Sequence, residues 1–270
     1  YYDIEEELIM WFIKLLERSE DRIIKGLKKG LELPAAMEEV FRGVKVTAQD
    51  IKRALEVTGL DKKDFENWTP SDDRKFATAL REISKPTIVV ANKMDLDTAP
   101  ENFRRLRDNL VDKIVVPCSA EAELILRRAE QRGLIKYVPG EEKFEIINES
   151  ALTDKQKWAL EIIRRKVLDE YMRTGVQFAL NVAVFKLLKM SAVYPVYDVK
   201  KLSDHKGNIL PDVYLMPEGA TVEDLAREIH SDLAKGILYA VDARTGLRLP
   251  ASYKLKDRDV LSIVSGRKKT

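Results

Sequence analysis

Two short polar segments in the middle of the chain each follow a short apolar run. Asn-Lys-Met-Asp at 92–95 comes directly after the β-branched run 86–91, and Cys-Ser-Ala at 118–120 comes after the run 114–117. Continuous runs of this kind predict strands that are buried on both faces of a parallel sheet. Because ligands of open α/β sheets bind beyond the carboxyl ends of the strands, we expect both polar segments to line one binding site.

The residue types in these segments fit recognition of guanine. This base presents its N1–H and its N2 amine side by side, and the Asp95 carboxylate can accept both hydrogen bonds, whereas adenine offers no matching pair of donors. Asn92 would brace the loop and reach the N7 side of the base, and Lys93 would lay its aliphatic stem over the base face. The backbone N–H of Ala120 would meet guanine O6, and Ser119 would shape that loop. The alternative is an ordinary surface loop with an Asx turn.

The sequence lacks the patterns that bind nucleotide phosphates. No G-x-x-x-x-G-K-[ST] pattern occurs, and no D-x-x-G follows an early strand. Because phosphoryl transfer needs such a loop and a Ser or Thr on Mg²⁺, we assign no catalytic residue and no metal ligand to this chain. The chain starts at Tyr1, and we expect the phosphate-binding motifs, with their Mg²⁺, in a segment that precedes it.

The composition restricts the class of protein. The chain has 270 residues and a formal net charge of +2, which is too small to indicate nucleic-acid binding from bulk charge. The one cysteine, Cys118, excludes an internal disulfide framework and suits a reducing compartment. No apolar run approaches the ~18–20 residues of a membrane span, and no signal peptide is visible. The sequence therefore predicts a cytoplasmic protein without a membrane partner.

Changes of pattern divide the chain into three parts. Residues 1–83 predict helices, residues 84–192 alternate strand and helix as in an α/β unit with parallel strands, and residues 193–270 predict a compact α+β module, with β-grasp as the natural candidate. The first helix is expected to bury one apolar face, which consists of Ile4, Leu8, Trp11, Phe12 and Leu15.

The order of these parts resembles that of a known family. The two polar segments are similar to the fourth and fifth motifs of P-loop GTPases, written N-K-x-D and S-A. The segments 215–226 and 253–264 resemble a TGS domain, the module shared by threonyl-tRNA synthetase, certain GTPases and stringent-response enzymes. Nearly the whole chain resembles the archaeal branch of the YchF/Obg-related GTPases.

The resemblance implies a fold and a function. It implies the C-terminal half of a P-loop GTPase sheet with a helical insertion, followed by a TGS-like β-grasp domain. It also implies that the full-length protein binds GTP or GDP and hydrolyses GTP, in a translation-linked role with the ribosome or RNA as partner. Two alternatives stay open, namely a nucleotide-independent RNA- or ribosome-binding fragment and an ATP-preferring ATPase like some YchF relatives. The retained Asp95 argues for GTP.

Overall fold

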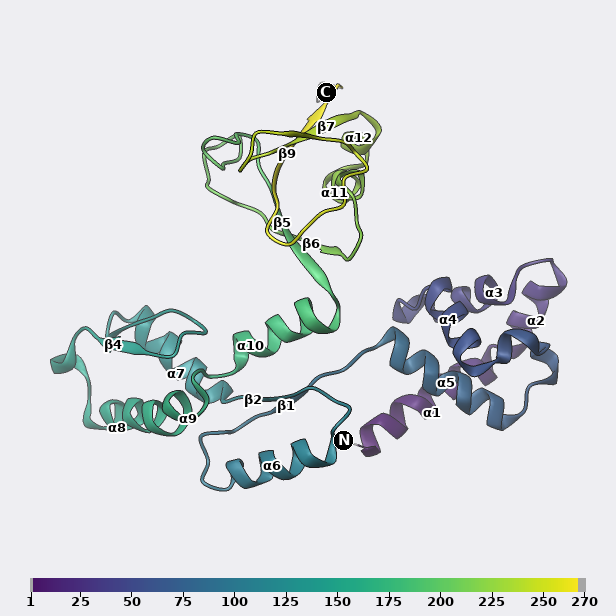
Figure 1. Cartoon of the computed structure of the whole chain (residues 1–270). Helices are drawn as coiled ribbons and strands as arrows, with labels where there is room; N and C mark the ends of the chain where they lie inside the picture. The colour runs from purple at the N-terminus through teal and green to yellow at the C-terminus, as the bar shows by residue number, and fades with distance from the viewer. Residues whose placement is uncertain (1, 267–270) are drawn as a thin grey trace. The chain divides into compact units, whose positions relative to one another are not determined.

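The computed structural model describes residues 2–266 of the chain (Figure 1). The chain divides into two compact units that meet between Thr87 and Ile88. Among the described residues, no helix combines the length and the apolar character needed to cross a membrane.

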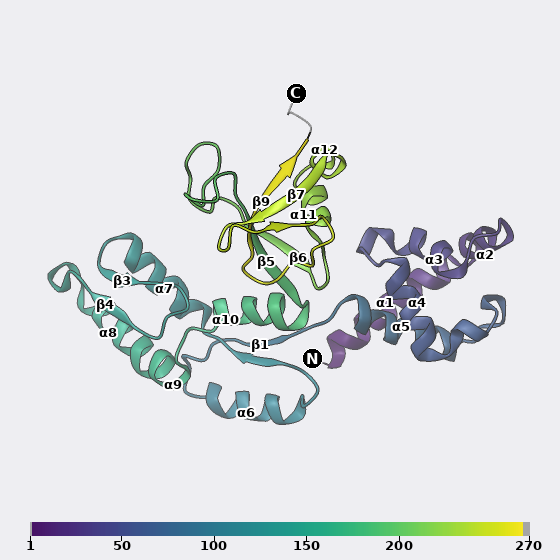
Figure 2. The same ribbon diagram turned by 45° about the horizontal axis from the view of Figure 1, so that its top comes forward.

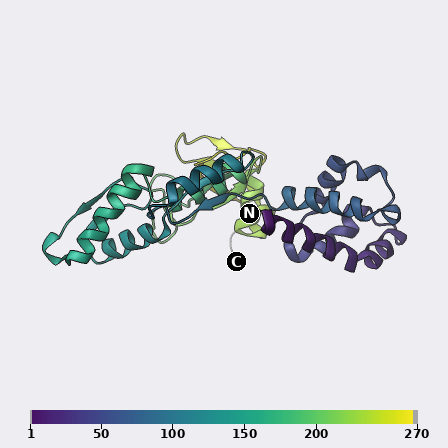
Figure 3. The ribbon, with the colours of Figure 1, turned by 90° about the horizontal axis from the view of Figure 1, so that it is seen from below.

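Every regular element described in the first unit is a helix (Figure 3). The α-helices are α1 (Tyr2–Arg18), α2 (Glu20–Lys28), α3 (Leu33–Phe41), α4 (Ala48–Thr58) and α5 (Pro70–Ser84). Three short 3-10 helices connect them, η1 (Arg42–Val44), η2 (Leu60–Lys62) and η3 (Phe65–Asn67). The starts of α4 and α5 are fixed by capping boxes, in which Thr47 and Thr69 exchange hydrogen bonds with the residue three positions on.

The buried face of α1 is narrower than the sequence predicts. Phe12 and Leu16 are 3% and 2% exposed and belong to the core of the first unit. The predicted burial is wrong for Ile4, Leu8 and Trp11, which are 62%, 39% and 45% exposed. The apolar stripe of α1 is wider than the surface that the other helices of this unit cover.

A buried ion pair joins α1 to α5. The Arg81 side chain is 4% exposed, and its Nη2 donates to Glu5 Oε1 at 2.6 Å and to Thr87 Oγ1 at 2.7 Å. Its Nη1 donates to the carbonyl oxygen of Lys85 at 2.7 Å. Because a buried guanidinium without its carboxylate is costly, Glu5 stabilises the contact between the start of α1 and the end of α5.

The second unit opens with a parallel pair of strands. β1 (Val89–Ala91) pairs with β2 (Val115–Pro117), α6 (Ala99–Asn109) connects them, and α7 (Ala120–Gln131) follows β2. The expectation of strands buried on both faces holds for Val116 of β2, which is 1% exposed. It is wrong for β1, where Val90 is 42% exposed because no described element covers that side of the strand.

The rest of the α/β part packs around α7. Its elements are β3 (Ile135–Tyr137), β4 (Phe144–Ile146), η4 (Glu149–Ala151), α8 (Asp154–Ile163), the π-helix η5 (Arg164–Leu168), α9 (Asp169–Tyr171), α10 (Val176–Asn181) and the π-helix η6 (Val182–Leu187). β3 and β4 form an antiparallel pair. The core between α7, β3 and α8 contains Ala122, Leu126, Ile135, Leu160 and Ile163.

The C-terminal part is a five-stranded mixed sheet with a helix on one face (Figure 2). Its elements are β5 (Met190–Pro195), β6 (Tyr214–Pro217), α11 (Val222–Ile229), α12 (Ser231–Lys235), β7 (Ile237–Asp242), β8 (Arg248–Leu249) and β9 (Val260–Ser265). The strand order is β6-β5-β9-β7-β8, in which β5 and β9 are parallel and the other pairs antiparallel. Val222, Leu225 and Ala226 of α11 are buried, and this arrangement confirms the predicted β-grasp-like module.

Replacing Glu5 with Ala should lower the free energy of unfolding of the first unit by about 2–4 kcal/mol, since it leaves the buried Arg81 guanidinium without its counter-ion. Urea denaturation of the full chain, followed by circular dichroism, measures this loss. Glu6→Ala is the matched control, because Glu6 pairs with Arg74 on the surface, where both side chains are about half exposed. Equal losses in the two variants would contradict a special role for the buried pair.

Candidate functional site

The two polar segments meet at the carboxyl ends of β1 and β2. The N–H of Cys118 donates to the carbonyl oxygen of Ala91 at 2.9 Å, and the N–H of Met94 donates to the carbonyl oxygen of Cys118 at 3.1 Å. The parallel pairing of the strands therefore continues into both loops. The structure thus places the segments 92–95 and 118–120 side by side.

The Asn92 side chain joins the two loops. Its Oδ1 accepts hydrogen bonds from the N–H of Lys93 at 2.8 Å and from the N–H of Ala120 at 3.1 Å. Asn92 thus braces the loop, as the sequence hypothesis has it. The same hypothesis has the N–H of Ala120 donate to guanine O6. In this structure, that N–H donates to Asn92 Oδ1. A ligand oxygen would have to share or replace that bond.

Asp95 and Ser119 form the second bridge between the loops. The Ser119 Oγ donates to Asp95 Oδ1 at 2.6 Å and accepts from the N–H of Ala122 at 3.3 Å, as the N-cap of α7. Ser119 is 0% exposed. The other carboxylate oxygen of Asp95, Oδ2, makes no hydrogen bond within residues 2–266. One oxygen is therefore fixed by the protein and the other keeps its acceptor capacity.

Lys93 has a left-handed backbone conformation, with φ of +68°. This conformation is uncommon for a residue other than glycine and stores local strain. It allows Met94 to be buried, at 3% exposure, while Lys93 stays exposed. The stem of Lys93 is therefore accessible to cover a flat ligand.

A third segment, which we did not assign to the site from the sequence, packs against the loop 118–120. The N–H of Ser119 donates to the carbonyl oxygen of Thr174 at 2.7 Å, and Thr174 is 0% exposed. Gly175 has a φ of +90°, and a Cβ at this position would lie 2.1 Å from the carbonyl oxygen of Pro117. Only glycine permits this approach. In the sequence the Thr-Gly pair indicates no more than a break between two helices.

Glu123 of α7 holds this third segment in place. The side chain is buried, and its carboxylate accepts hydrogen bonds from Thr174 Oγ1 at 2.6 Å, Arg127 Nε at 2.7 Å, Gln177 Nε2 at 2.7 Å and the Tyr137 hydroxyl at 2.9 Å. Burial by itself raises the pKa of this carboxyl, but the hydrogen bonds outweigh it and leave the pKa below its usual value. Glu123 is therefore ionised at neutral pH and links α7, β3 and the start of α10.

The remaining groups near the site have other chemistry. Burial, with a smaller effect of the Glu123 charge, raises the pKa of the Cys118 thiol, so this thiol stays protonated at neutral pH. Across the described residues, no group of three or more His, Cys, Asp or Glu side chains is arranged to hold a metal ion.

Comparison with known proteins decides the family. A family model described as the Obg-like GTPase YGR210-like, G4 motif-containing domain matches residues 90–198, and a TGS domain model matches residues 205–265. The crystal structure of a GTP binding protein from Pyrococcus horikoshii OT3 is 36% identical, with a TM-score of 0.77, and the match covers 98% of this chain and 70% of that chain. The chain belongs to the Obg-like family of GTP-binding proteins. This confirms the resemblance found in the sequence.

Curated relatives of the Obg-like chain are longer than the chain itself. It is 39% identical over 262 residues to MJ1332 of Methanocaldococcus jannaschii, an uncharacterised GTP-binding protein, and the match covers 97% of this chain and 65% of the relative. It is 24% identical over 209 residues to the GTPase Obg of Bacillus cereus, with 73% of this chain and 48% of that protein covered. The Obg-like chain thus spans between about half and two thirds of these two relatives.

Gly175→Ala should lower the free energy of unfolding of the second unit by about 3 kcal/mol, because the added methyl group meets the Pro117 carbonyl and the backbone is left-handed. Gly133→Ala is the matched control, since Gly133 has a φ of +68° but nothing lies within 4 Å of its added Cβ. The control should cost about 1 kcal/mol of backbone strain alone. Urea denaturation compares the two variants, and similar costs would show that the close approach is unimportant.

Glu123→Gln should destabilise the second unit at pH 7 by about 2 kcal/mol, because four donors lose a charged acceptor. The pKa of Glu123 is lower in the folded protein than its ordinary value of 4.5. Its stabilising contribution is therefore complete above about pH 4.5 and is lost as the pH falls through the folded-state pKa. The difference in the free energy of unfolding between wild type and Glu123→Gln should therefore disappear at acid pH.

Denaturation curves between pH 3 and pH 8 measure this effect of Glu123, with Glu121→Gln as the control on the exposed side of the same helix. The control should follow the wild type at every pH. A gap between wild type and Glu123→Gln that stays constant with pH would refute the role of the ionised carboxylate.

Proposed function

We propose that the loops 92–95 and 118–120 bind the guanine base of GTP or GDP. The observation that carries this proposal is the Asp95 carboxylate, which the Ser119 hydroxyl fixes at 2.6 Å while Oδ2 keeps its acceptor sites. A carboxylate held in this way matches the adjacent N1–H and N2 amine donors of guanine. Adenine would leave it without partners, which is the basis of a large discrimination.

The other residues of the two loops complete the proposed recognition. The aliphatic stem of Lys93 covers one face of the base, since Lys93 is exposed next to the buried Met94. Guanine O6 shares the N–H of Ala120, which Asn92 Oδ1 accepts at 3.1 Å without ligand. The amide group of Asn92 then reaches the N7 side of the base. The GTP-binding relatives support a guanine nucleotide as the ligand.

The activity of the whole protein is a further part of this proposal. We infer a cytoplasmic GTPase of the YchF/Obg type that uses Mg²⁺ and acts as a translation-linked switch on the ribosome or RNA. The combination of an Obg-like domain with a TGS domain supports this role. In it, residues 1–83 are the helical insertion, 84–192 the C-terminal half of the GTPase domain and 193–270 the TGS-like domain. The 270 residues contain no phosphate-binding pattern, so this chain alone is not expected to hydrolyse nucleotide.

Asp95→Asn should shift the preference from GTP towards xanthosine triphosphate by about 100-fold or more, because xanthine replaces the N2 amine with an acceptor that the Asn amide can satisfy. Competition with a fluorescent guanine nucleotide, in the longest form of the protein that its gene encodes, measures this preference. Asp112→Asn, in an exposed loop, is the control. An unchanged preference in Asp95→Asn would end the proposal, and stronger competition by ATP than by GTP in the wild type would favour the ATP-preferring alternative.

A further inference from the structure

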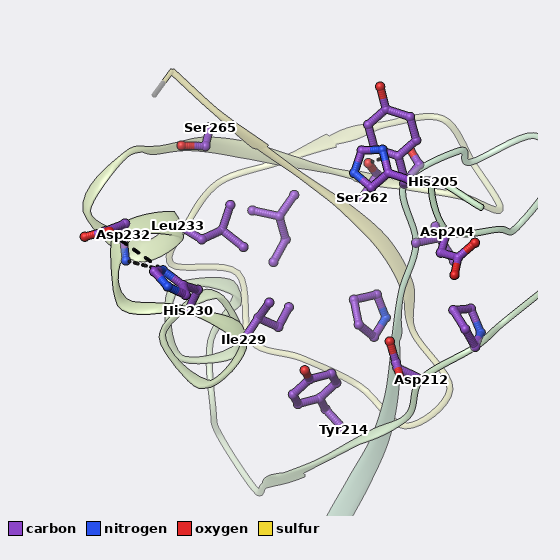
Figure 4. Close-up of a pocket in the computed structure, with 15 residues that line it drawn as sticks. Asp204, His205, Asp212, Tyr214, Ile229, His230, Asp232, Leu233, Ser262 and Ser265 are labelled. Atoms are coloured by element: carbon purple, nitrogen blue, oxygen red, sulfur yellow. Dashed lines mark hydrogen bonds and ion pairs between the residues drawn. The ribbon is translucent and has the colours of Figure 1, made fainter. Parts of the chain in front are cut away.

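The C-terminal part contains a pocket of about 660 Å³ that is separate from the loops 92–95 and 118–120 (Figure 4). Its lining residues come from the end of β5, the connection between β5 and β6, the first residue of β6, the junction of α11 with α12, and β9. Figure 4 shows Ile229 and Leu233 towards the middle of the pocket and polar side chains around them. A volume of this size suits a small ligand or one segment of a partner.

The charged side chains that line the pocket, apart from its two histidines, are all acidic. They are Asp204, Asp212 and Asp232, and no lysine or arginine among residues 2–266 lines the pocket. Hydrogen bonds, first of all from the Asn208 side chain, lower the pKa of Asp204 and keep it ionised. Asp232 has Lys235 at 3.4 Å as a partner. Asp212 makes no hydrogen bond or ion pair with any described residue.

The charges of these side chains determine which ligand charge the pocket can bind. Of the three lining aspartates, Asp232 alone has a basic partner among the described residues, so the carboxylates of the pocket repel the phosphates of a nucleic acid, which proteins bind largely through lysine and arginine. The negative electrostatic potential of these carboxylates attracts a cation. The low net charge of the whole chain conceals this local excess of acid.

The aromatic residues restrict the kind of cation. The rings of Tyr197 and His205 lie against each other, with centroids 3.6 Å apart, and both line the pocket. Tyr214 lines it as well, two residues after Asp212. A guanidinium group stacks on aromatic faces and gives a carboxylate two parallel hydrogen bonds, whereas an ammonium group acts as a point charge. The pocket therefore suits arginine better than lysine.

Apolar residues next to the pocket indicate that the cation belongs to a protein. Ile209 and Val213, which flank the lining residues Pro211 and Asp212, are 73% and 55% exposed, and Tyr197 is 63% exposed. Exposed apolar side chains beside a polar pocket are typical of protein interaction surfaces. A small cation would leave them uncovered.

We propose that this pocket binds an arginine-containing segment of a partner protein. The guanidinium pairs with Asp212, the lining carboxylate that has no partner among the described residues, and stacks on the neighbouring aromatic side chains. The apolar residues beside the arginine pack on Ile229 and Leu233.

The test is a titration of the full chain with a fluorescein-labelled peptide, Leu-Arg-Val-Arg-Ile, followed by fluorescence anisotropy in low salt. We expect saturable binding that weakens as salt is added. Asp212→Asn should weaken binding about tenfold, through the loss of a charge-assisted hydrogen bond. Asp212 is exposed and has no partner within residues 2–266, so this substitution does not endanger the fold. Replacing both arginines of the peptide with lysine should also weaken binding.

Glu228→Gln is the matched control, because Glu228 is an exposed acid of α11 outside the pocket, and its affinity for the peptide should equal that of the wild type. The absence of saturable binding, or equal losses in Asp212→Asn and Glu228→Gln, would overturn the proposal. A single-stranded RNA 12-mer serves as competitor and should leave the peptide bound. Displacement by this RNA, together with weaker RNA binding in Asp212→Asn, would assign the pocket to RNA and also overturn it.

Discussion

The arrangement of the candidate site depends on one backbone contact, the hydrogen bond from the N–H of Ser119 to the carbonyl oxygen of Thr174. Gly175 follows directly and lets two backbones approach to a distance that no side chain would permit. On one side of this contact, the loop 118–120 is joined to Asn92 by the hydrogen bond from the N–H of Ala120 to Asn92 Oδ1. On the other side Glu123 fixes Thr174 with a charged hydrogen bond in a buried setting. The polar loops are thus supported from behind by a second polar network that is shielded from water.

The loops were predictable from the sequence, whereas their support was not. The segments 92–95 and 118–120 follow short apolar runs, and parallel pairing brings strand ends of this kind to one edge, so local pattern and topology suffice to place them together. Glu123 contacts Thr174, which lies 51 residues further along the chain, and no local pattern encodes a partner at that separation. The exposure of Val90 was missed for a related reason, since an apolar run indicates a strand but does not say which of its faces will be covered.

Carboxylates are used in two ways in this chain. A neighbouring hydroxyl holds Asp95, so the direction of its carboxylate is fixed, and in the proposed function this carboxylate distinguishes between neutral bases that differ in their donors. In the proposed arginine site, no described lysine or arginine lines the pocket, so its aspartates would act through their combined electrostatic field as well as through single contacts. The formal net charge of +2 reveals neither arrangement, because recognition depends on where charges are placed and which partners they already have.

At Lys93, which has a left-handed backbone conformation, folding stability and the proposed ligand recognition favour different residues. Glycine would adopt this conformation without strain, so selection for folding stability alone would favour glycine at position 93. Glycine would also remove the aliphatic stem that covers the base in the proposed function. In the proposed function, the lysine at this position lowers the stability of the fold and contributes to ligand recognition. Sequence optimisation that rewards thermal stability alone would therefore replace the residue that is proposed to cover the base, while it raises the stability of the fold.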